Sequence, residues 1–356
     1  MKATDEQSVL EARVIAGIKE SAAGSFDDRS FAELALAMHE FQRRHNVAYD
    51  RYCRALGTPM PLADWRRIPG VPQQAFKHAE LRTFPADQTT ATFHTSGTTG
   101  EGPGRHHFRS LALYEQATRA GWRQAGLPQR RPQFILIPPP AEAPRSSLSH
   151  MMGAVGEFAT EQIWCAHVTD GAMSIDLAAF ADRVEVACGP VVVLGTALSF
   201  LHVFERLGER RLHLPEGSIA LETGGYKGSG RALTKAELYA SFESRLGLVP
   251  ESIWNEYGMT ELSSQCYARG LNEPHRAPPW LRALVIDPAT NEEVQRGGTG
   301  VLKLIDLANV GSVVGIQTQD LAVRRDAGAF ELLGRDPAAL PRGCSRAADE
   351  MLSVPS

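Results

Sequence analysis

Short apolar segments that alternate with helix-length stretches dominate the middle of this 356-residue sequence. They have the pattern of buried strands and span residues 133–138, 191–195, 218–225 and 252–258. Between the last two, Thr234-Lys235-Ala236-Glu237 has the form of a capping box that begins a helix, and Gly247 is placed to end it. A strand, a helix and a second strand in succession form a βαβ unit. The sequence therefore predicts an α/β fold.

The two ends of the chain have other patterns. Ser30-Phe31-Ala32-Glu33 predicts the start of a helix, and Gly57 is placed to end a second helix over 49–56. The first helix should bury one apolar face, formed by Phe31, Leu34, Ala35, Met38 and Phe41. Another helix is expected over 110–126. From Trp280 onward the chain predicts short strands separated by turn residues, over 281–286, 301–307, 315–324 and 330–334.

These patterns predict four parts of the chain. A helical segment over 1–90 packs on an α/β core over 91–279, which is followed by a small β subdomain over 280–335 and a short tail over 336–356 that carries Cys344. We expect parallel sheets layered with helices in the core.

The composition excludes several classes of function. A formal charge of −4 gives no electrostatic case for binding nucleic acid or an anionic membrane. No apolar run approaches the roughly 20 residues of a membrane span, and the polar, acidic N-terminal residues do not form a secretory signal, so we expect a cytoplasmic protein. The five cysteines are scattered and include no C-x-x-C pair, which indicates neither a disulfide framework nor a zinc site.

The segment 93–105 contains the highest density of glycines and hydroxyl side chains. Its glycines permit close backbone approach, and Ser96, Thr98 and Thr99 add short donors, so the segment could hold a polyphosphate. It has neither the P-loop order nor the dinucleotide-binding spacing of glycines. A solvated surface loop has the same composition, so the segment alone leaves both interpretations open.

Two further polar segments lie at the ends of predicted strands. Residues 222–226 fall at the carboxyl end of the third strand and residues 257–261 at that of the fourth, where α/β sheets bind ligands. Within the second segment, the Thr260 hydroxyl suits a phosphate and the Glu261 carboxylate suits Mg²⁺.

Taken together, these motifs resemble the adenylate-forming superfamily, whose members activate carboxylates with ATP. The resemblance rests on segments 95–100, 257–261 and 318–320 in that order. Within the superfamily, the chain is most similar to the acyl-protein synthetases of bacterial luminescence systems, through segments 68–72, 75–77, 222–228 and 342–345. The likeness runs from about Phe31 to Ser345, and it implies the fold of the superfamily's N-terminal domain.

The resemblance assigns a role to each candidate residue. The β- and γ-phosphates of ATP would lie on Thr95, Ser96, Gly97, Thr98, Thr99 and Gly100, with Arg105 where many members have a lysine. Gly224, Gly225 and Tyr226 would line the adenine, and Tyr257 beside Gly258 would stack on it. Thr260 would contact the α-phosphate, Glu261 would bind Mg²⁺, Asp320 would bind the ribose with Arg335 nearby, and His150 would line the acyl and phosphate pocket.

Alternatives stay open for several of these residues. Arg105 and the two histidines after it could form an exposed basic cluster, and His150 could be an ordinary core histidine. Tyr257 could be a core aromatic residue, and Asp320 a surface carboxylate.

The main departure from most of the superfamily concerns its C-terminal domain. Most of the superfamily carries a separate C-terminal domain with a catalytic lysine, and we expect none in this chain, as in the luminescence synthetases. The cation that faces the α-phosphate would then be Lys227, Lys303 or Arg335, among which the sequence does not choose.

The resemblance implies an acid–thiol ligase reaction. A carboxylate, from resemblance a fatty acid, would attack the ATP α-phosphorus to give acyl-AMP and Mg-pyrophosphate. The acyl chain would occupy an apolar tunnel near His150, Trp164 and residues 195–199. It would then pass to Cys344, whose flanking arginines favour the thiolate, and on to a partner such as an acyl reductase.

Two other functions fit the same motifs. One is a stand-alone ligase that transfers an aryl or other biosynthetic acid to CoA or a carrier protein. The other is a regulatory protein that binds nucleotide without turnover.

Overall fold

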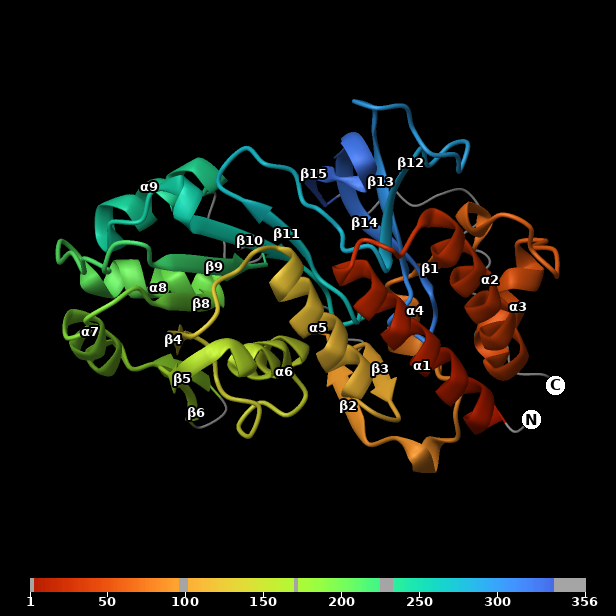
Figure 1. Cartoon of the computed structure of the whole chain (residues 1–356), viewed down its shortest axis with the longest axis horizontal. Coiled ribbons are helices and arrows are strands. Elements are labelled where there is room, and N and C mark those ends of the chain that lie inside the picture. Colours follow the sequence, from red (N-terminus) through yellow and green to blue (C-terminus); the bar gives the residue numbers. More distant parts are fainter. Residues whose placement is uncertain (1–2, 96–101, 170–171, 225–232, 336–356) are drawn as a thin grey trace. The chain divides into compact units, whose positions relative to one another are not determined.

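The computed structural model describes residues 3–95, 102–169, 172–224 and 233–335 (Figure 1). The chain divides into two compact units. The first is formed by Met1–Gln124, Met259–Gln265 and Arg276–Ser356, and the second by Ala125–Gly258 and Cys266–His275. One change of unit therefore falls between Gly258 and Met259, inside the motif 257–261.

A six-stranded sheet is the centre of the second unit among the described residues. Its order is β11-β10-β9-β8-β4-β5, and all neighbours are parallel except β10 and β11. The strands are β4 (Arg131–Ile135), β5 (Ala159–Trp164), β8 (Val192–Thr196), β9 (Ile219–Thr223), β10 (Ile253–Tyr257) and β11 (Cys266–Arg269). Helices α7 (Leu177–Glu185), α8 (Ala197–Leu207) and α9 (Lys235–Leu246) share its apolar core (Figure 1). The predicted α/β fold is confirmed.

The segment from β9 through α9 to β10 forms as predicted. Thr234 caps α9 through its side chain, Glu237 completes the capping box, and Gly247 ends the helix in the left-handed conformation, with φ of 69°. β9 and β10 pair in parallel, which makes Asn255 the neighbour of Glu222 and Glu256 the neighbour of Thr223. The carboxyl ends of both strands therefore lie together.

The first unit contains a second sheet, with order β1-β14-β13-β12 and with β15 paired to β14. Its strands are β1 (Val71–Pro72), β12 (Leu281–Ile286), β13 (Thr299–Asp306), β14 (Gly315–Arg324) and β15 (Phe330–Arg335). Helices α1 (Ala3–Ala22), α2 (Asp28–His45) and α5 (Ala112–Gln124) share a core with β12 and β13 (Figure 1). The strands predicted after Trp280 are thus present, within one or two residues of their predicted bounds.

The start of α2 differs from its prediction. Ser30 does not cap the helix, because the Asp27 side chain already accepts a hydrogen bond of 2.8 Å from the Ser30 backbone N–H. The helix consequently begins one turn earlier. Its predicted apolar face is buried as expected, and α3 (Val47–Ala55) follows.

Two β-hairpins, two short α-helices and five short 3₁₀ helices complete the elements of the described residues. One hairpin, β2 (Ala91–His94) with β3 (Arg105–Phe108), brackets the glycine-rich segment. The other joins β6 (Ala166–Thr169) to β7 (Ala172–Ile175), and the α-helices are α4 (Ala75–His78) and α6 (Ser147–Ala154).

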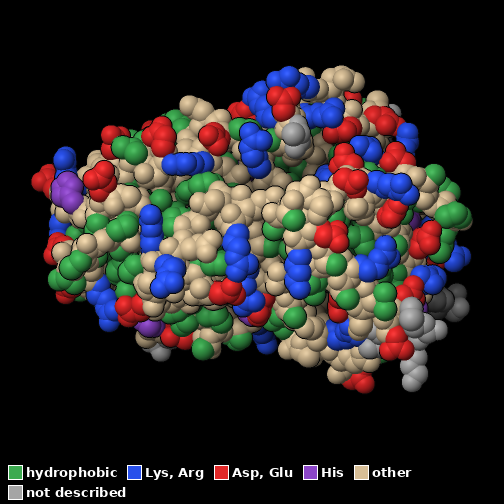
Figure 2. All heavy atoms as spheres, viewed as in Figure 1, with side chains coloured by type: hydrophobic (Ala, Val, Ile, Leu, Met, Phe, Trp, Pro, Cys, Tyr) green, Lys and Arg blue, Asp and Glu red, His purple; other side chains and the backbone are tan. Residues whose placement is uncertain are grey.

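The visible surface intersperses Lys and Arg with Asp and Glu side chains, without a large region of one sign (Figure 2). No helix within the described ranges has both the length and the apolarity to cross a membrane. The four-part division of the chain stays a prediction, and the tail with Cys344 lies outside the described residues.

Candidate active site

Two hydrogen bonds at the end of the β2–β3 hairpin join Thr95 and Gly104, which flank the central part of the glycine-rich segment. The Thr95 backbone N–H donates to the Gly104 carbonyl at 3.0 Å, and the Gly104 N–H donates to the Thr95 hydroxyl at 2.7 Å. A Cβ at position 104 would come within 3.1 Å of the Thr95 side chain, so glycine fits this close approach. The predicted phosphate-binding residues Ser96, Gly97, Thr98, Thr99 and Gly100 lie outside the described residues.

His106 joins this hairpin to the second half of the motif 257–261. Its Nδ1 lies 2.8 Å from the Thr260 carbonyl oxygen, and its ring contacts Phe76 and Phe108. Burial lowers the pKa of His106 to about 4, so the neutral ring donates its Nδ1–H to this carbonyl at neutral pH. His106 therefore does not belong to an exposed basic cluster. The Thr260 hydroxyl in turn lies 3.4 Å from the His94 carbonyl oxygen.

Arg105, at the start of β3, is half exposed and faces Glu80 at 3.6 Å. The same carboxylate faces His107 at 3.7 Å, and His107 also bonds to the Thr92 hydroxyl at 3.0 Å. Arg105 thus lies at the C-terminal end of the glycine-rich segment with a surface ion pair, and its contact with a phosphate stays a prediction.

Glu261 is a buried carboxylate with an unusual titration. Glu261 is 5% exposed, and burial raises the pKa of its carboxyl to about 7. The positive charges of Arg335 and Lys77 act in the other direction and lower this pKa. The Asp320 carboxylate adds to the increase. The charges of Arg335, Asp320 and Lys77 therefore all act on the Glu261 carboxyl. The resemblance gives roles to Arg335 and Asp320 but none to Lys77.

Asp320 and Arg335 lie opposite each other on β14 and β15. The Arg335 Nε lies 3.1 Å from the Asp320 Oδ1, and the Asp320 backbone N–H donates to the Thr318 hydroxyl at 3.1 Å. Asp320 is 9% exposed, whereas the Arg335 side chain is 52% exposed. Asp320 is therefore a largely buried, oriented carboxylate and does not fit the surface alternative.

A buried polar network holds the backbone around Glu261. The Asn309 side chain donates to the Glu261 carbonyl at 2.8 Å and accepts from the Ser263 hydroxyl at 2.6 Å. The Asp306 carboxylate accepts from the Ser263 N–H at 2.9 Å and from the Ser264 hydroxyl at 2.7 Å. Fully partnered buried networks of this kind rigidify a segment. Sequence reasoning missed the network, because its members lie far apart in the chain.

Of the cations predicted to face the α-phosphate, Lys303 has a structural role. Its buried ammonium donates to the carbonyls of Arg66 at 2.8 Å and Ile68 at 3.2 Å, which attaches the segment before β1 to β13. Lys227 lies outside the described residues. Arg335 and Lys77, both of which influence Glu261, are the cations near this carboxylate that the structure describes.

In the second unit, polar side chains occupy the carboxyl ends of β9 and β10. Gly224 has φ of 73°, which favours glycine, and Gly225 and Tyr226 lie outside the described residues. Tyr257, which Gly258 follows, is half-buried, and its ring contacts His275 edge to face. Burial raises the pKa of both Glu222 and Glu256 to about 7. Sequence reasoning missed Asn255, Glu256 and His275.

The predicted acyl pocket is only partly defined. His150 is half-buried on α6, and Trp164 ends β5. At the end of β8, a Cβ on Gly195 would lie 3.1 Å from Leu136 and 3.3 Å from Phe200. Side chains therefore pack closely at this point, and the acyl tunnel and the role of His150 stay predictions.

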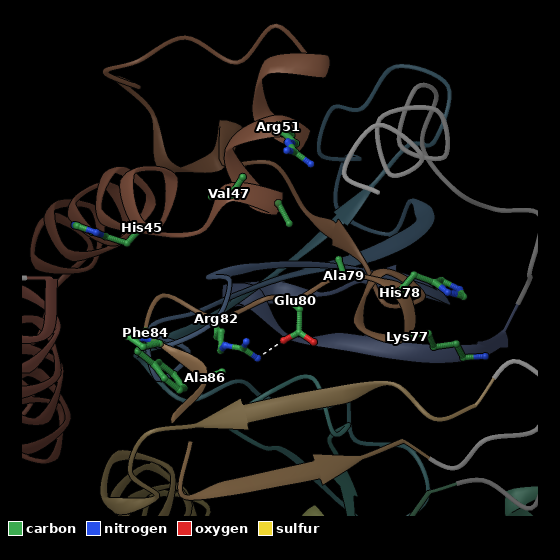
Figure 3. A pocket seen from close by; sticks show the side chains of 12 residues that line it. His45, Val47, Arg51, Lys77, His78, Ala79, Glu80, Arg82, Phe84 and Ala86 are labelled. Carbon is green, nitrogen blue, oxygen red and sulfur yellow. Dashed lines mark hydrogen bonds and ion pairs between the residues drawn. The ribbon is translucent and has the colours of Figure 1, made fainter. Parts of the chain in front are cut away.

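A hollow of about 730 Å³ lies in the first unit beside α3, α4 and residues 79–86 (Figure 3). Arg51, Lys77, His78 and Arg82 line it, and the Arg82 guanidinium pairs with Glu80. Of the predicted nucleotide-binding residues that the structure describes, none lines this hollow. The hollow shares Lys77 with the surroundings of Glu261, and we centre the candidate site on Glu261.

Comparison with solved structures identifies the fold as that of adenylate-forming enzymes. A 2-hydroxyisobutyryl-CoA ligase in complex with 2-HIB-AMP is 14% identical, with a TM-score of 0.64 over 85% of this chain and 67% of the ligase. The same ligase in an open conformation with 2-HIB-AMP and CoA is 15% identical, with a TM-score of 0.64 over 89% of this chain and 77% of the ligase. ATP-bound MatB from Rhodopseudomonas palustris is 19% identical, with a TM-score of 0.50 over 71% of this chain.

The chain spans about half of MatB, 49% of its length. No curated protein matches the sequence. The family model of the acyl-protein synthetase LuxE matches residues 9–353, and the chain belongs to this family.

Proposed function

We propose that the protein activates a carboxylic acid with ATP, giving acyl-AMP and pyrophosphate, and then transfers the acyl group to a thiol. The observation that carries this proposal is the buried Glu261, whose pKa of about 7 responds to Arg335, Asp320 and Lys77. The adenylate-forming fold and the LuxE family support it. Perturbed carboxyl groups beside cations are common in catalytic sites.

The site's chemistry fits Mg²⁺ held mainly by phosphate oxygens. Within the described ranges, no three His, Cys, Asp or Glu side chains gather to hold a metal, but Mg²⁺ bound with nucleotide needs few protein carboxylates. Glu261 would be its protein ligand. When bound, Mg²⁺ neutralises charge on the phosphates. The hydrogen bond from His106 to the Thr260 carbonyl positions the residue before Glu261.

The remaining residues bind and orient ATP in this proposal. Residues 95–100, with Arg105, hold the β- and γ-phosphates. The hydrogen bonds between Thr95 and Gly104 define the ends of that loop. Asp320 accepts hydrogen bonds from the ribose hydroxyls, and Arg335 orients Asp320 through their contact of 3.1 Å. Tyr257 and residues 224–226 contact the base.

The carboxylate oxygen of the acid attacks the α-phosphorus, and the bond to the pyrophosphate oxygen breaks. The developing negative charge is stabilised by fixed cations, for which Arg335 and Lys77 are the proposed groups. A thiolate then attacks the acyl carbonyl and AMP leaves with the bonding electron pair. This gives a thioester and regenerates the site.

We assign the thiol to Cys344, between Arg342 and Arg346 in the sequence, and a long-chain fatty acid to the acyl group. Of the other cysteines, Cys53, Cys165 and Cys266 are buried, and burial raises the pKa of Cys53 and Cys165 to about 12, which disfavours the thiolate. Cys188 is exposed and serves as a matched control. An acyl reductase that accepts the group from the thioester would be the partner.

The test combines pyrophosphate exchange with thioester labelling. Wild-type protein with Mg-ATP should catalyse acid-dependent exchange, faster with long-chain acids than with acetate, because each buried methylene adds about 0.8 kcal/mol to binding. Radiolabelled acid should form a hydroxylamine-sensitive adduct with wild-type protein and Cys188→Ser, but not with Cys344→Ser, whereas exchange persists in all three.

Each failure has a separate meaning. ATP binding without exchange for any acid would overturn the proposed activity and favour a regulatory protein. Exchange confined to aryl or other acids would overturn the fatty-acid assignment. If exchange occurs but Cys344→Ser is labelled as strongly as the wild type, or if the wild type is not labelled at all, the role of Cys344 is overturned. Transfer to CoA or a carrier protein is then favoured.

A further inference from the structure

A chain of hydrogen bonds links α9, β9 and β10 to His275 in the second unit. The Asn255 Nδ2 donates to the Glu222 Oε1 at 2.6 Å, and the His275 Nε2 lies 2.5 Å from the Asn255 Oδ1. The Tyr239 hydroxyl lies 3.5 Å from the same Glu222 oxygen. Glu222, Tyr239 and His275 are all at least nine-tenths buried. Of these side chains, none has a part in the proposed reaction.

The protons of this chain follow from its chemistry. Burial lowers the pKa of His275 to about 3, so the ring is neutral at neutral pH and carries one N–H. Because the Asn255 amino group faces the Glu222 carboxylate, its carbonyl oxygen faces His275. The His275 Nε2 must therefore carry the proton and donate to Asn255, which fixes the tautomer.

The segment that carries His275 is attached at its other end as well. The Lys235 ammonium donates to the Gly270 carbonyl at 3.1 Å and lies 5.1 Å from the centre of the Tyr239 ring. Lys235 is also the charged group that acts on both Glu222 and His275. Residues 270–275 are thus held at one end by α9 and at the other by β10.

His275 contacts the candidate base-stacking residue from this fixed position. Tyr257 follows Asn255 by two residues on β10, so both side chains are on the same face of the strand. The Tyr257 and His275 ring centres are 5.9 Å apart, with an angle of 65° between the planes, which is an edge-to-face contact. One imidazole therefore contacts Tyr257 and bonds to Asn255 at the same time.

We propose that His275 is a positioning residue of the nucleotide site, because its hydrogen bond to Asn255 holds the imidazole against Tyr257 and so orients the Tyr257 ring for the base of ATP. This inference rests on the proposed function, in which Tyr257 stacks on adenine. Fixing a ring before binding reduces the conformational entropy lost when a ligand binds. The effect belongs to recognition of the base and not to the phosphates or to the chemical step.

Three substitutions separate the two contacts of His275. His275→Phe keeps an aromatic ring but removes the donor, His275→Gln keeps an N–H donor but removes the ring, and His275→Ala removes both. His213→Ala, at an exposed histidine of the same unit, is the control. For each protein, the Kd of Mg-ATP and of Mg-tripolyphosphate is measured by calorimetry, together with KM for ATP and kcat of exchange.

The expected result is a loss confined to ATP. His275→Ala should weaken ATP binding about tenfold, with smaller losses for His275→Phe and His275→Gln. Tripolyphosphate affinity and kcat at saturating ATP should stay within about twofold of wild type. ATP affinity unchanged in His275→Ala, or equal losses for ATP and tripolyphosphate, would overturn the inference.

Measurements on the wild-type protein distinguish a failure of this inference from a failure of the proposed function. ATP binding without exchange would overturn the proposed reaction, while the affinities of the variants would still decide the role of His275. A wild type that binds tripolyphosphate but shows no added affinity for ATP would overturn the role of His275 and leave acid activation to be tested by exchange.

Discussion

Glu261 combines two properties that a metal ligand at a nucleotide site requires. It is a hard oxygen donor, and the network through Asn309 fixes its backbone. Its pKa of about 7 means that the carboxylate loses its proton near neutral pH, when a metal ion competes for the same oxygen atoms. As the proposed Mg²⁺ ligand, Glu261 would therefore link metal binding to pH.

The Mg²⁺ dependence of exchange should follow this ionisation. Between pH 6 and pH 8 the ionised fraction of a group with a pKa near 7 increases about tenfold, so the Mg²⁺ concentration for half-maximal exchange should fall by about the same factor. Glu261→Gln should slow exchange by orders of magnitude and remove this pH effect. Glu243→Gln, at an exposed carboxylate on α9, should behave like wild type. Unchanged exchange in Glu261→Gln would exclude Glu261 from the reaction.

At the scale of elements, Glu256 joins two parallel strands. The Thr223 hydroxyl on β9 donates to the Glu256 carboxyl on β10, and burial raises the pKa of Glu256 to about 7. A carboxyl whose pKa is raised on folding favours the folded state most when it is protonated. Its contribution is fully present below the unfolded pKa of about 4.5 and is lost as pH rises through about 7.

Glu256→Gln should remove this contribution and keep an acceptor for Thr223. The free energy of unfolding of wild-type protein should fall more steeply between pH 5 and pH 8 than that of the variant, by on the order of 2 kcal/mol. Denaturant titrations at both pH values measure the difference. Parallel pH profiles for the two proteins would show that Glu256 is not the titrating group.

How well the sequence predicted an element depended on whether its signal was local. The two capping boxes show this: Thr234 caps α9 as predicted, but at Ser30 the same pattern lies inside the first turn, because Asp27 provides the cap. The sequence predicted β4, β8, β9, β10 and the strands after Trp280, because most of these contain short apolar runs, but it missed β5 and β11. It did not predict α1, because the buried apolar side chains of this helix, Leu10, Val14 and Ile18, are spaced among polar residues.

The candidate site shows the same division. Motif residues such as Glu261 and Asp320 could be named in advance, and the structure gives them the burial and partners described above. His275 could not, because it lies in a polar segment and its contacts with Asn255 and Tyr257 are fixed only by the fold. His106 was named, but only the fold shows that it is buried and bonded to Thr260.

At the scale of the whole molecule, each compact unit carries its own part of the proposed chemistry. The first unit holds the groups proposed for the phosphates, metal and ribose, and the second holds those proposed for the base. The motif 257–261 contains the boundary between them, so Tyr257 and Glu261 belong to different units. We propose that the protein directs a carboxylate to the α-phosphorus of ATP.

The most direct measurement follows an oxygen atom of the acid. Wild-type protein is incubated with Mg-ATP, a thiol acceptor and a long-chain acid labelled with ¹⁸O in its carboxylate, and the AMP formed is analysed by mass spectrometry. Attack at the α-phosphorus followed by transfer to the thiol leaves one ¹⁸O atom on AMP, and we expect this product. Label in inorganic phosphate with formation of ADP, or AMP without label, would contradict it.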